Sequence, residues 1–144
     1  MITYKTGDLF SSDCKVLVNT VNCDGFMGRG IALHFKKLYP DMFKKYKSFC
    51  QRDMIKIGVL YLWTSEDKWV LNFPTKDHWR YKSKYSYIEE GLLKFVDTYK
   101  EKGIDSIAFP KLGCSNGGLE WSRVKEMIET HLGELEDIDI EVYV

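Results

Sequence analysis

The sequence predicts an α/β domain in which helices cover both faces of a central sheet. Apolar strand-like segments alternate with amphipathic helical segments along the 144 residues. Two glycine-rich loops each lie between an apolar strand and a helix, as in ligand-binding α/β folds. No linker, repeat or low-complexity stretch interrupts the chain, so residues 1–144 are expected to form one domain with a substantial core.

The individual elements follow from hydrophobic periodicity and from helix start and stop signals. Strands are expected at residues 2–5, 15–19, 57–63, 68–73, 104–109 and 138–144. Helices are expected at residues 30–38, 41–52, 87–102 and 121–132. Pro40 is expected to end the first helix, Asp41 to cap the second and Gly103 to end the third. This order predicts the α/β sandwich.

Composition is that of a globular protein, but the charges are unevenly distributed. Residues 29–84 contain 13 Lys and Arg against 5 Asp and Glu, whereas residues 85–144 contain 6 against 13. This asymmetry indicates a face for an anionic partner, unless the charges mix on solvated helix faces in three dimensions. Four scattered cysteines without metal-binding spacing indicate free thiols in a cytoplasmic protein. No secretory signal or membrane span is visible.

The two glycine-rich loops are the clearest functional feature. The first spans residues 22–30 and the second spans residues 113–118. Glycine lets backbone amides approach a ligand, and a following helix adds the positive end of its dipole. Both loops, and residues 74–76, are expected at the carboxyl ends of strands, so they could converge on one cleft. Neither loop matches a Rossmann or P-loop fingerprint, which leaves another kind of diphosphate site, or simple tight turns.

Three polar residues near these strand ends are candidate site residues. Asp8 is a candidate acceptor for an exocyclic amine such as that of adenine. Asn22 could hold sugar hydroxyls, or it could only satisfy the backbone of its own loop. Lys76 closes an apolar strand, where desolvation or neighbouring cations would lower its pKa and make it a nucleophile toward a sugar carbon. A solvated surface charge is the alternative for Lys76.

Residues 76–85 interleave basic and aromatic side chains. Single-stranded nucleic-acid grooves use the same combination, because cations neutralise phosphates and aromatic rings stack on bases. The predicted nucleic-acid contacts are His78, Trp79, Arg80, Lys82 and Lys84. The alternative is an exposed loop whose aromatic rings fold onto the core.

Three segments together resemble the macrodomain family. They are residues 19–33, 72–80 and 110–121, which read NTVNCDGFMGRGIAL, NFPTKDHWR and PKLGCSNGGLEW. The likeness extends through nearly the whole chain and is nearest to DarG-type DNA ADP-ribosyl glycohydrolases, the antitoxin half of DarT–DarG systems. The chain also resembles the terminal ADP-ribose protein glycohydrolase branch. The resemblance implies a three-layer α/β/α macrodomain with a central mixed sheet of about six strands and an ADP-ribose cleft.

The resemblance also implies roles for individual residues. Asp8 would hold the adenine amine beside the Leu9 backbone, Asn22 would orient the distal ribose, and Lys76 would act at its anomeric carbon. The implied ligand-binding set is Asp8, Leu9, Thr20, Asn22, Gly28, Arg29, Gly30, Ile31, Pro74, Thr75, Leu112, Gly113, Cys114, Ser115, Asn116, Gly117, Gly118 and Leu119. The terminal glycohydrolase branch has an aspartate where this sequence, like the DarG-type pattern, has Gly117.

The expected function is removal of ADP-ribose from nucleobases, above all thymidine in single-stranded DNA, with Lys76 and Asn22 as catalytic residues. The expected partners are ADP-ribosylated single-stranded DNA and a DarT-like toxin. A monomer is expected, without a metal, a cofactor or a membrane partner, and with ADP-ribose as ligand and product.

Other functions stay open at this point. One is hydrolysis of ADP-ribose from acidic protein side chains, or of O-acetyl-ADP-ribose or ADP-ribose phosphate. Another is a non-catalytic ADP-ribose-binding module. DarG-type proteins usually continue into a C-terminal region, so the 144 residues are expected to be either a stand-alone enzyme or an excised domain.

Overall fold

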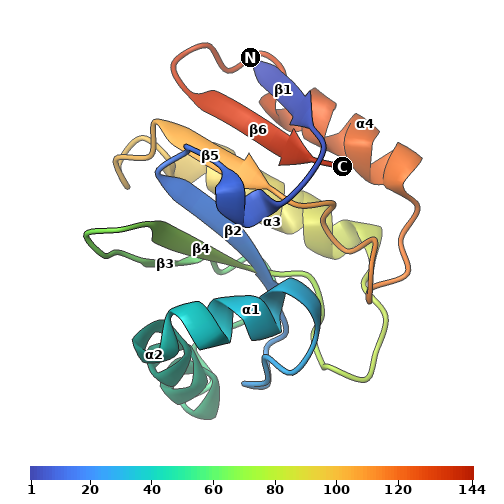
Figure 1. Cartoon of the computed structure of the whole chain (residues 1–144). Coiled ribbons are helices and arrows are strands. Elements are labelled where there is room, and N and C mark those ends of the chain that lie inside the picture. Colours follow the sequence, from blue (N-terminus) through green and yellow to red (C-terminus); the bar gives the residue numbers. More distant parts are fainter.

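The computed structural model describes all 144 residues as one six-stranded sheet with four α-helices (Figure 1). The strands are β1 (Ile2–Lys5), β2 (Val16–Val21), β3 (Tyr61–Trp63), β4 (Trp69–Pro74), β5 (Ser106–Phe109) and β6 (Asp139–Tyr143). The helices are α1 (Gly30–Leu38), α2 (Pro40–Gln51), α3 (Tyr85–Thr98) and α4 (Trp121–Leu132), with a short 3-10 turn, η1, at Leu9–Ser11. None of the helices has the length and hydropathy needed to cross a bilayer.

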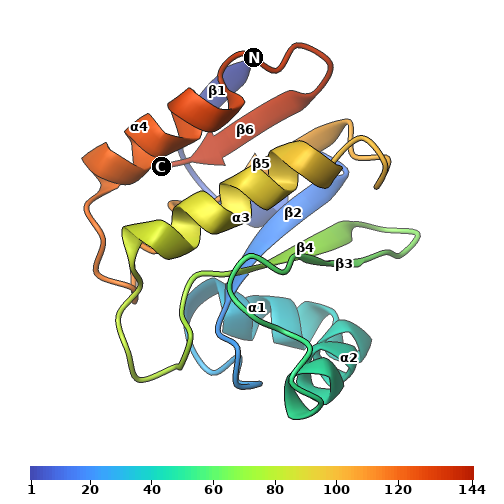
Figure 2. The ribbon, with the colours of Figure 1, turned by 180° about the vertical axis from the view of Figure 1, so that it is seen from behind.

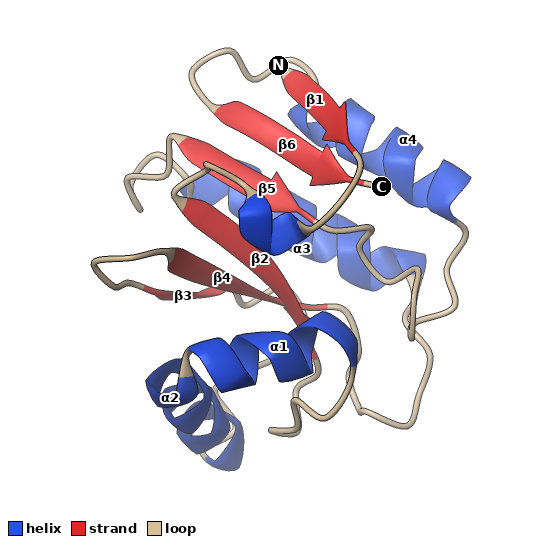
Figure 3. Ribbon diagram, in the orientation of Figure 1, coloured by secondary structure: helices blue, strands red, loops and turns tan.

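The sheet has the strand order β1-β6-β5-β2-β4-β3. All neighbouring strands pair in parallel except β3, which pairs antiparallel with β4 through the turn at residues 64–68 (Figure 3). The predicted mixed sheet of about six strands is therefore confirmed. Because β1, β2, β4, β5 and β6 run in the same direction, their carboxyl ends lie at one edge of the sheet.

Helices cover both faces of the sheet, as Figures 1 and 2 show from opposite sides. Alternate residues of β2 point to opposite faces of the sheet, where they join two separate clusters of buried hydrophobic residues. Val16 belongs to the cluster that contains buried residues of α3 and α4, and Leu17 belongs to the cluster that contains buried residues of α1 and α2. The first cluster includes the buried Phe95 of α3, and the second includes the buried Phe35 of α1. The three-layer α/β/α architecture is confirmed.

Several element boundaries differ from the sequence-based expectation. The predicted Asp41 cap is wrong, because α2 begins at Pro40 with Tyr39 as the N-cap residue. Proline at the first helical position needs no hydrogen-bond acceptor and has a suitable φ, so it starts this helix rather than only ending the previous one. The strand expected at residues 57–63 is limited to β3, because Gly58 has a φ of +84° in a turn closed by the Val59 amide and the Lys56 carbonyl.

The charge asymmetry persists in three dimensions. Helices α1 and α2 carry five lysines and one aspartate on one face of the sheet. Helices α3 and α4 carry three basic and five acidic residues, histidine aside, on the opposite face. The sheet separates these two helical layers, so their charges do not mix on one surface (Figure 2).

Gly91 sets the distance between α3 and the sheet. A Cβ atom at this buried position would overlap the ring of Phe73 in β4. We expect Gly91→Ala to lower the free energy of unfolding by about 1–3 kcal/mol, because overpacking a rigid core displaces side chains and backbone. Urea unfolding measures this change.

Leu93→Ala is the matched control, because Leu93 is an exposed apolar residue of the same helix. It should change the free energy of unfolding by no more than about 0.5 kcal/mol. Alanine is a better helix former than glycine by about 1 kcal/mol, so a more stable Gly91→Ala protein would contradict the packing argument.

Candidate functional site

A cleft of about 850 Å³ opens at the edge where the parallel strands end. This volume is typical of small-molecule sites, which span about 300–1,000 Å³. All five parallel strands supply lining residues at or just beyond their carboxyl ends: Gly7, Asp8 and Leu9 after β1, Thr20, Val21 and Asn22 at β2, Thr75 and Lys76 after β4, Pro110 and Lys111 after β5, and Tyr143 and Val144 at β6. The two glycine loops complete the lining.

The first glycine loop ends in the free amides of helix α1. The first hydrogen bond of this helix joins the Leu33 amide to the Arg29 carbonyl at 3.2 Å. The amides of residues 30–32 therefore have no acceptor within the helix, and the N-cap residue Arg29 supplies no side-chain acceptor. Unpaired amides at a helix N-terminus, together with the helix dipole, favour an anion.

The second glycine loop presents further amides to the same cleft. It is closed by a 3.0 Å hydrogen bond from the Leu119 amide to the Gly113 carbonyl, and the amides of residues 115–118 have no backbone acceptor. The two loops lie against each other, because a Cβ atom added to Gly30 would lie 3.3 Å from Nδ2 of Asn116. An anion between the loops could thus accept hydrogen bonds from both.

Gly117 has no room for a side chain. A Cβ atom there would overlap Oγ of Ser83 and the carbonyl oxygen of Gly113. The Ser83 amide also donates to the Gly117 carbonyl at 3.0 Å, so Ser83 ties the segment before α3 to this loop. The aspartate of the terminal glycohydrolase branch could not replace Gly117 without a change in the loop.

Lys76 lies half-buried in the cleft wall, directly after β4. Its Nζ donates a long hydrogen bond of 3.4 Å to the Trp79 carbonyl. Burial, and secondly the nearby Arg29 guanidinium, lower the pKa of Lys76 below its usual value. Both causes increase the fraction of neutral amine, which is the nucleophilic form.

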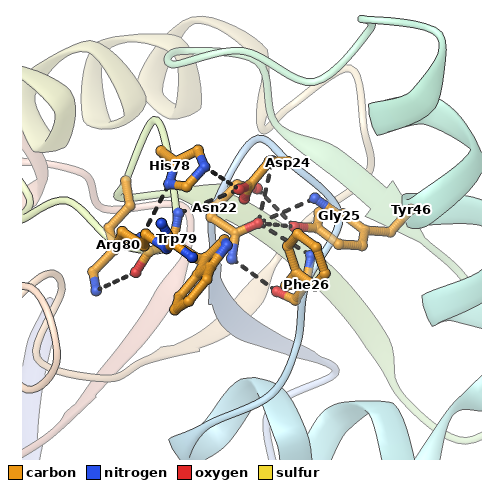
Figure 4. A network of polar contacts seen from close by, with 9 residues as sticks. Asn22, Asp24, Gly25, Phe26, Tyr46, His78, Trp79 and Arg80 are labelled. Atoms are coloured by element: carbon orange, nitrogen blue, oxygen red, sulfur yellow. Dashed lines mark hydrogen bonds and ion pairs between the residues drawn. The ribbon is translucent and has the colours of Figure 1, made fainter.

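A chain of polar contacts connects helix α2 to the segment that carries Lys76 (Figure 4). The hydroxyl group of the buried Tyr46 lies 2.7 Å from the Asn22 carbonyl oxygen and 2.8 Å from Asn22 Oδ1. Asn22 Oδ1 also accepts from the Asp24 amide. The Asp24 carboxylate in turn accepts from the Trp79 amide at 3.5 Å and lies 3.3 Å from Nε2 of His78.

Asn22 mainly builds its own loop. Its Oδ1 accepts from the amides of residues 24–26, and its Nδ2 donates to the Phe26 carbonyl at 2.8 Å. This is the backbone-satisfying arrangement that the sequence left open. Asn22 also lines the cleft, and the second Nδ2 hydrogen has no partner in the chain. That hydrogen is what Asn22 can offer to a sugar hydroxyl.

Most of the predicted ligand-binding residues line the cleft. They are Asp8, Leu9, Thr20, Asn22, Gly28, Arg29, Gly30, Ile31, Thr75, Gly113, Cys114, Ser115, Asn116 and Gly117, with Lys76 beside them. Four predicted residues are outside the lining: Pro74, Leu112, Gly118 and Leu119. Pro74 and Leu112 are buried, and Leu119 packs against Gly113. Burial raises the pKa of the Cys114 thiol, so this group is a poor nucleophile.

Among the predicted nucleic-acid contacts, Trp79 lines the cleft and the other four are outside its lining. His78 pairs with Asp24, the Arg80 guanidinium lies 4.9 Å from the centre of the Trp79 ring, and the Lys82 side chain lies against Gly118. Lys84 is the N-cap residue of α3. The aromatic rings of this segment do not all fold onto the core, since Trp79 is 44% exposed and Tyr81 is 65% exposed.

Sequence reasoning missed eight lining residues: Gly7, Val21, Phe26, Ala32, Pro110, Lys111, Tyr143 and Val144. The strand-end argument could have found Tyr143 and Val144, because they close the last parallel strand. Phe26 lies inside the first glycine loop, but no local pattern shows that its ring faces the cleft.

Comparison with known proteins agrees with this architecture. The family model described as Macro domain matches residues 18–128, so the chain belongs to the macrodomain family. Over 99% of its length it is 44% identical to a DNA ADP-ribosyl glycohydrolase of Mycobacterium tuberculosis. It covers 42% of that relative, so it spans about two fifths of the length of such curated proteins.

Two solved structures are closely similar to this one. The macrodomain of Mycobacterium tuberculosis DarG superposes with a TM-score of 0.95 at 45% identity, with 99% of this chain and 97% of that chain covered. Thermosipho africanus DarTG in complex with ADP-ribose gives a TM-score of 0.93 at 36% identity, with 99% of this chain and 41% of that chain covered. A curated Thermosipho africanus relative is a DNA ADP-ribosyl transferase–DNA ADP-ribosyl glycohydrolase fusion protein, 36% identical over 95% of this chain and 40% of its own length.

The effect of Arg29 on Lys76 is measurable. Replacing Arg29 by Gln removes a cation that disfavours protonated Lys76, so the pKa of Lys76 should rise toward its ordinary value. An NMR titration of the ¹³Cε-labelled lysines measures the change, with Lys76→Arg to assign the signal. A lower or unchanged pKa in Arg29→Gln would contradict the electrostatic explanation.

The tight packing at Gly117 gives a second prediction. Gly117→Ala should lower the free energy of unfolding by about 1–3 kcal/mol, because its Cβ has no space. Gly28→Ala is the control: Gly28 lacks a positive φ and its Cβ would meet no atom, so stability should change by about 0.5 kcal/mol or less. Denaturant unfolding compares the two, and equal losses would refute the role given to Ser83 and Gly113.

Proposed function

We propose that this chain is a DNA ADP-ribosyl glycohydrolase, which removes ADP-ribose from thymidine in single-stranded DNA. The observation that carries the proposal is the half-buried amine of Lys76 in a cleft where two glycine loops present unpaired amides. The names of the Mycobacterium tuberculosis and Thermosipho africanus relatives support the choice of DNA. The ADP-ribose complex of Thermosipho africanus DarTG supports the choice of ligand.

The proposed ligand position follows from the distribution of polar groups along the cleft. The diphosphate lies between the free amides of residues 30–32 and those of residues 115–117. The adenine lies toward Asp8, whose Oδ1 accepts from the Phe10 amide while Oδ2 remains for an exocyclic amine. The distal ribose then lies near Lys76, where the unpaired Nδ2 hydrogen of Asn22 can orient a hydroxyl group.

Catalysis in this proposal rests on Lys76. The neutral amine adds to the anomeric carbon of the distal ribose, and the bond to the base nitrogen breaks. The base leaves with the bonding electron pair and takes up the proton that the amine loses. Water then releases ADP-ribose and restores the free amine.

The substrate assignment rests on the surroundings of Lys76. The segment after it carries the exposed Arg80, Lys82 and Lys84, which suit a phosphate backbone. In addition, the second loop, residues 113–118, contains no carboxylate, and Gly117 has no room for a side chain. This arrangement differs from that of the terminal ADP-ribose glycohydrolase branch, which has an aspartate at the position of Gly117.

We also propose the biological setting that the fusion relative suggests. A protein that joins a DNA ADP-ribosyl transferase to a glycohydrolase has two opposing activities in one chain. The partner proposed here is therefore a DarT-type transferase whose modification this enzyme reverses. The cytoplasm is the proposed compartment, since all four cysteines are free thiols.

The test is release of ADP-ribose from a single-stranded oligonucleotide that carries one ADP-ribosyl-thymidine. We expect turnover by the wild-type chain and a loss of kcat on the order of 100-fold or more in Lys76→Ala. Binding of free ADP-ribose to Lys76→Ala, measured by calorimetry, should persist because the glycine loops are intact.

Lys94→Ala is the matched control, since Lys94 is an exposed lysine of α3 outside the cleft. It should leave kcat within about twofold of wild type. Full activity of Lys76→Ala would refute the catalytic role. Binding of ADP-ribose without turnover of DNA-linked or glutamate-linked ADP-ribose would instead identify a binding module.

A further inference from the structure

Two exposed aromatic rings stand at the mouth of the cleft. Phe26, from the first glycine loop, is 55% exposed, and Trp79, from the segment after β4, is 44% exposed. Both line the same cleft as Lys76. Their ring centres are 6.1 Å apart with an interplanar angle of 65°, so they form an edge-on pair across two chain segments (Figure 4).

The main chain of each aromatic residue is held by polar contacts. The Phe26 amide donates to Asn22 Oδ1, and the Phe26 carbonyl accepts from Asn22 Nδ2. The Trp79 amide donates to Asp24, and the Trp79 carbonyl accepts from Lys76. The two residues are thus fixed at their backbones while about half of each residue's surface remains exposed, although His78 and Arg80 also lie against the Trp79 ring. A prearranged exposed pair of this kind is typical of a binding surface, because its residues are already ordered and binding a ligand costs less conformational entropy.

The aromatic pair lies close to Lys76, and this position indicates which part of a ligand it would contact. Lys76 Nζ is hydrogen-bonded to the carbonyl of Trp79, so the anomeric carbon of a ribose that reaches Lys76 lies next to this residue. A group attached to that carbon is therefore close to Trp79, and to Phe26, whose ring centre lies 6.1 Å from that of Trp79. The inference rests on the proposed function, in which the attached group is a nucleobase.

We propose that Phe26 and Trp79 form a stacking platform for the nucleobase to which ADP-ribose is attached, and that this platform selects nucleic acid over protein substrates. A planar base gains stacking energy on such rings, whereas a glutamate or aspartate side chain has no ring to stack. The charges nearby suit the phosphates of the same strand. Arg80 lies over the Trp79 ring, and Lys47 of α2 packs against Gly25 beside Phe26.

Equilibrium binding to Lys76→Ala protein tests the platform without turnover. Three probes are compared: free ADP-ribose, a single-stranded oligonucleotide with one ADP-ribosyl-thymidine, and a peptide with one ADP-ribosyl-glutamate. Adding Phe26→Ala or Trp79→Ala should weaken oligonucleotide binding about tenfold, the loss typical of one base–aromatic contact. Both should leave the Kd for ADP-ribose and for the peptide within about twofold.

Two further variants separate stacking from structural damage. Trp79→Phe keeps an aromatic ring and should keep oligonucleotide binding within about threefold of the Lys76→Ala parent. Leu93→Ala, an exposed apolar change on α3, should have no effect on any probe. Equal losses for all three probes would show that the rings act on the ribose or the loop, and unchanged oligonucleotide binding would show that they contact no base. Either result overturns the platform.

The platform and the proposed function fail in different experiments. If the wild-type chain releases no ADP-ribose from the oligonucleotide, the proposed activity fails. If the wild-type chain does release ADP-ribose, but the Phe26 and Trp79 variants bind the oligonucleotide normally, only the platform fails.

Discussion

The parallel direction of five strands is the constraint on which the site depends. From β1 to β4 the order is β1-β6-β5-β2-β4, so the strand ends extend over four interstrand spacings, or about 19 Å. Asp8 lies after the first of these strands and Lys76 after the last. A ligand that contacts both must be long and have two different ends, as ADP-ribose does. Antiparallel connections would place these two residues at opposite edges of the sheet.

Buried polar contacts fix the part of this edge that carries Lys76. Tyr46 is fully buried in α2, yet its hydroxyl group reaches Asn22 at the end of β2. Asn22 shapes the loop that contains Asp24, and the Asp24 carboxylate accepts a hydrogen bond from the Trp79 amide. Burial raises the pKa of Tyr46, so its hydroxyl group stays protonated and keeps donating. The position of Lys76 is therefore coupled to the packing of a helix on one face of the sheet.

The sequence predicts well what depends on local chemistry. Glycine spacing, apolar runs and Pro40 locate both loops and most elements, because turns and strand alternation are local properties. Prediction was weaker for side-chain direction. Pro74 and Leu112 belong to the motif segments, yet the structure buries both outside the cleft lining. A sequence motif is a run of neighbouring residues, and only the packed structure shows which of those residues face the cleft.

Contacts between distant segments could not be predicted at all. The Tyr46–Asn22 and Asp24–Trp79 hydrogen bonds join residues that are 24 and 55 positions apart. They depend on how α2 and the segment after β4 pack beside the first glycine loop. The exposure of Phe26 depends on the same loop, in which Asn22 is hydrogen-bonded to both the amide and the carbonyl of Phe26.

A crystal structure of Lys76→Ala protein with an ADP-ribosylated thymidine dinucleotide tests the central claim most directly. The account predicts the diphosphate between the amides of residues 30–32 and 115–117, and the anomeric carbon beside position 76. It also predicts the adenine beside Asp8 and the thymine against Phe26 and Trp79. A ligand bound in the reverse direction, with the thymine-bearing ribose at Asp8, would contradict it.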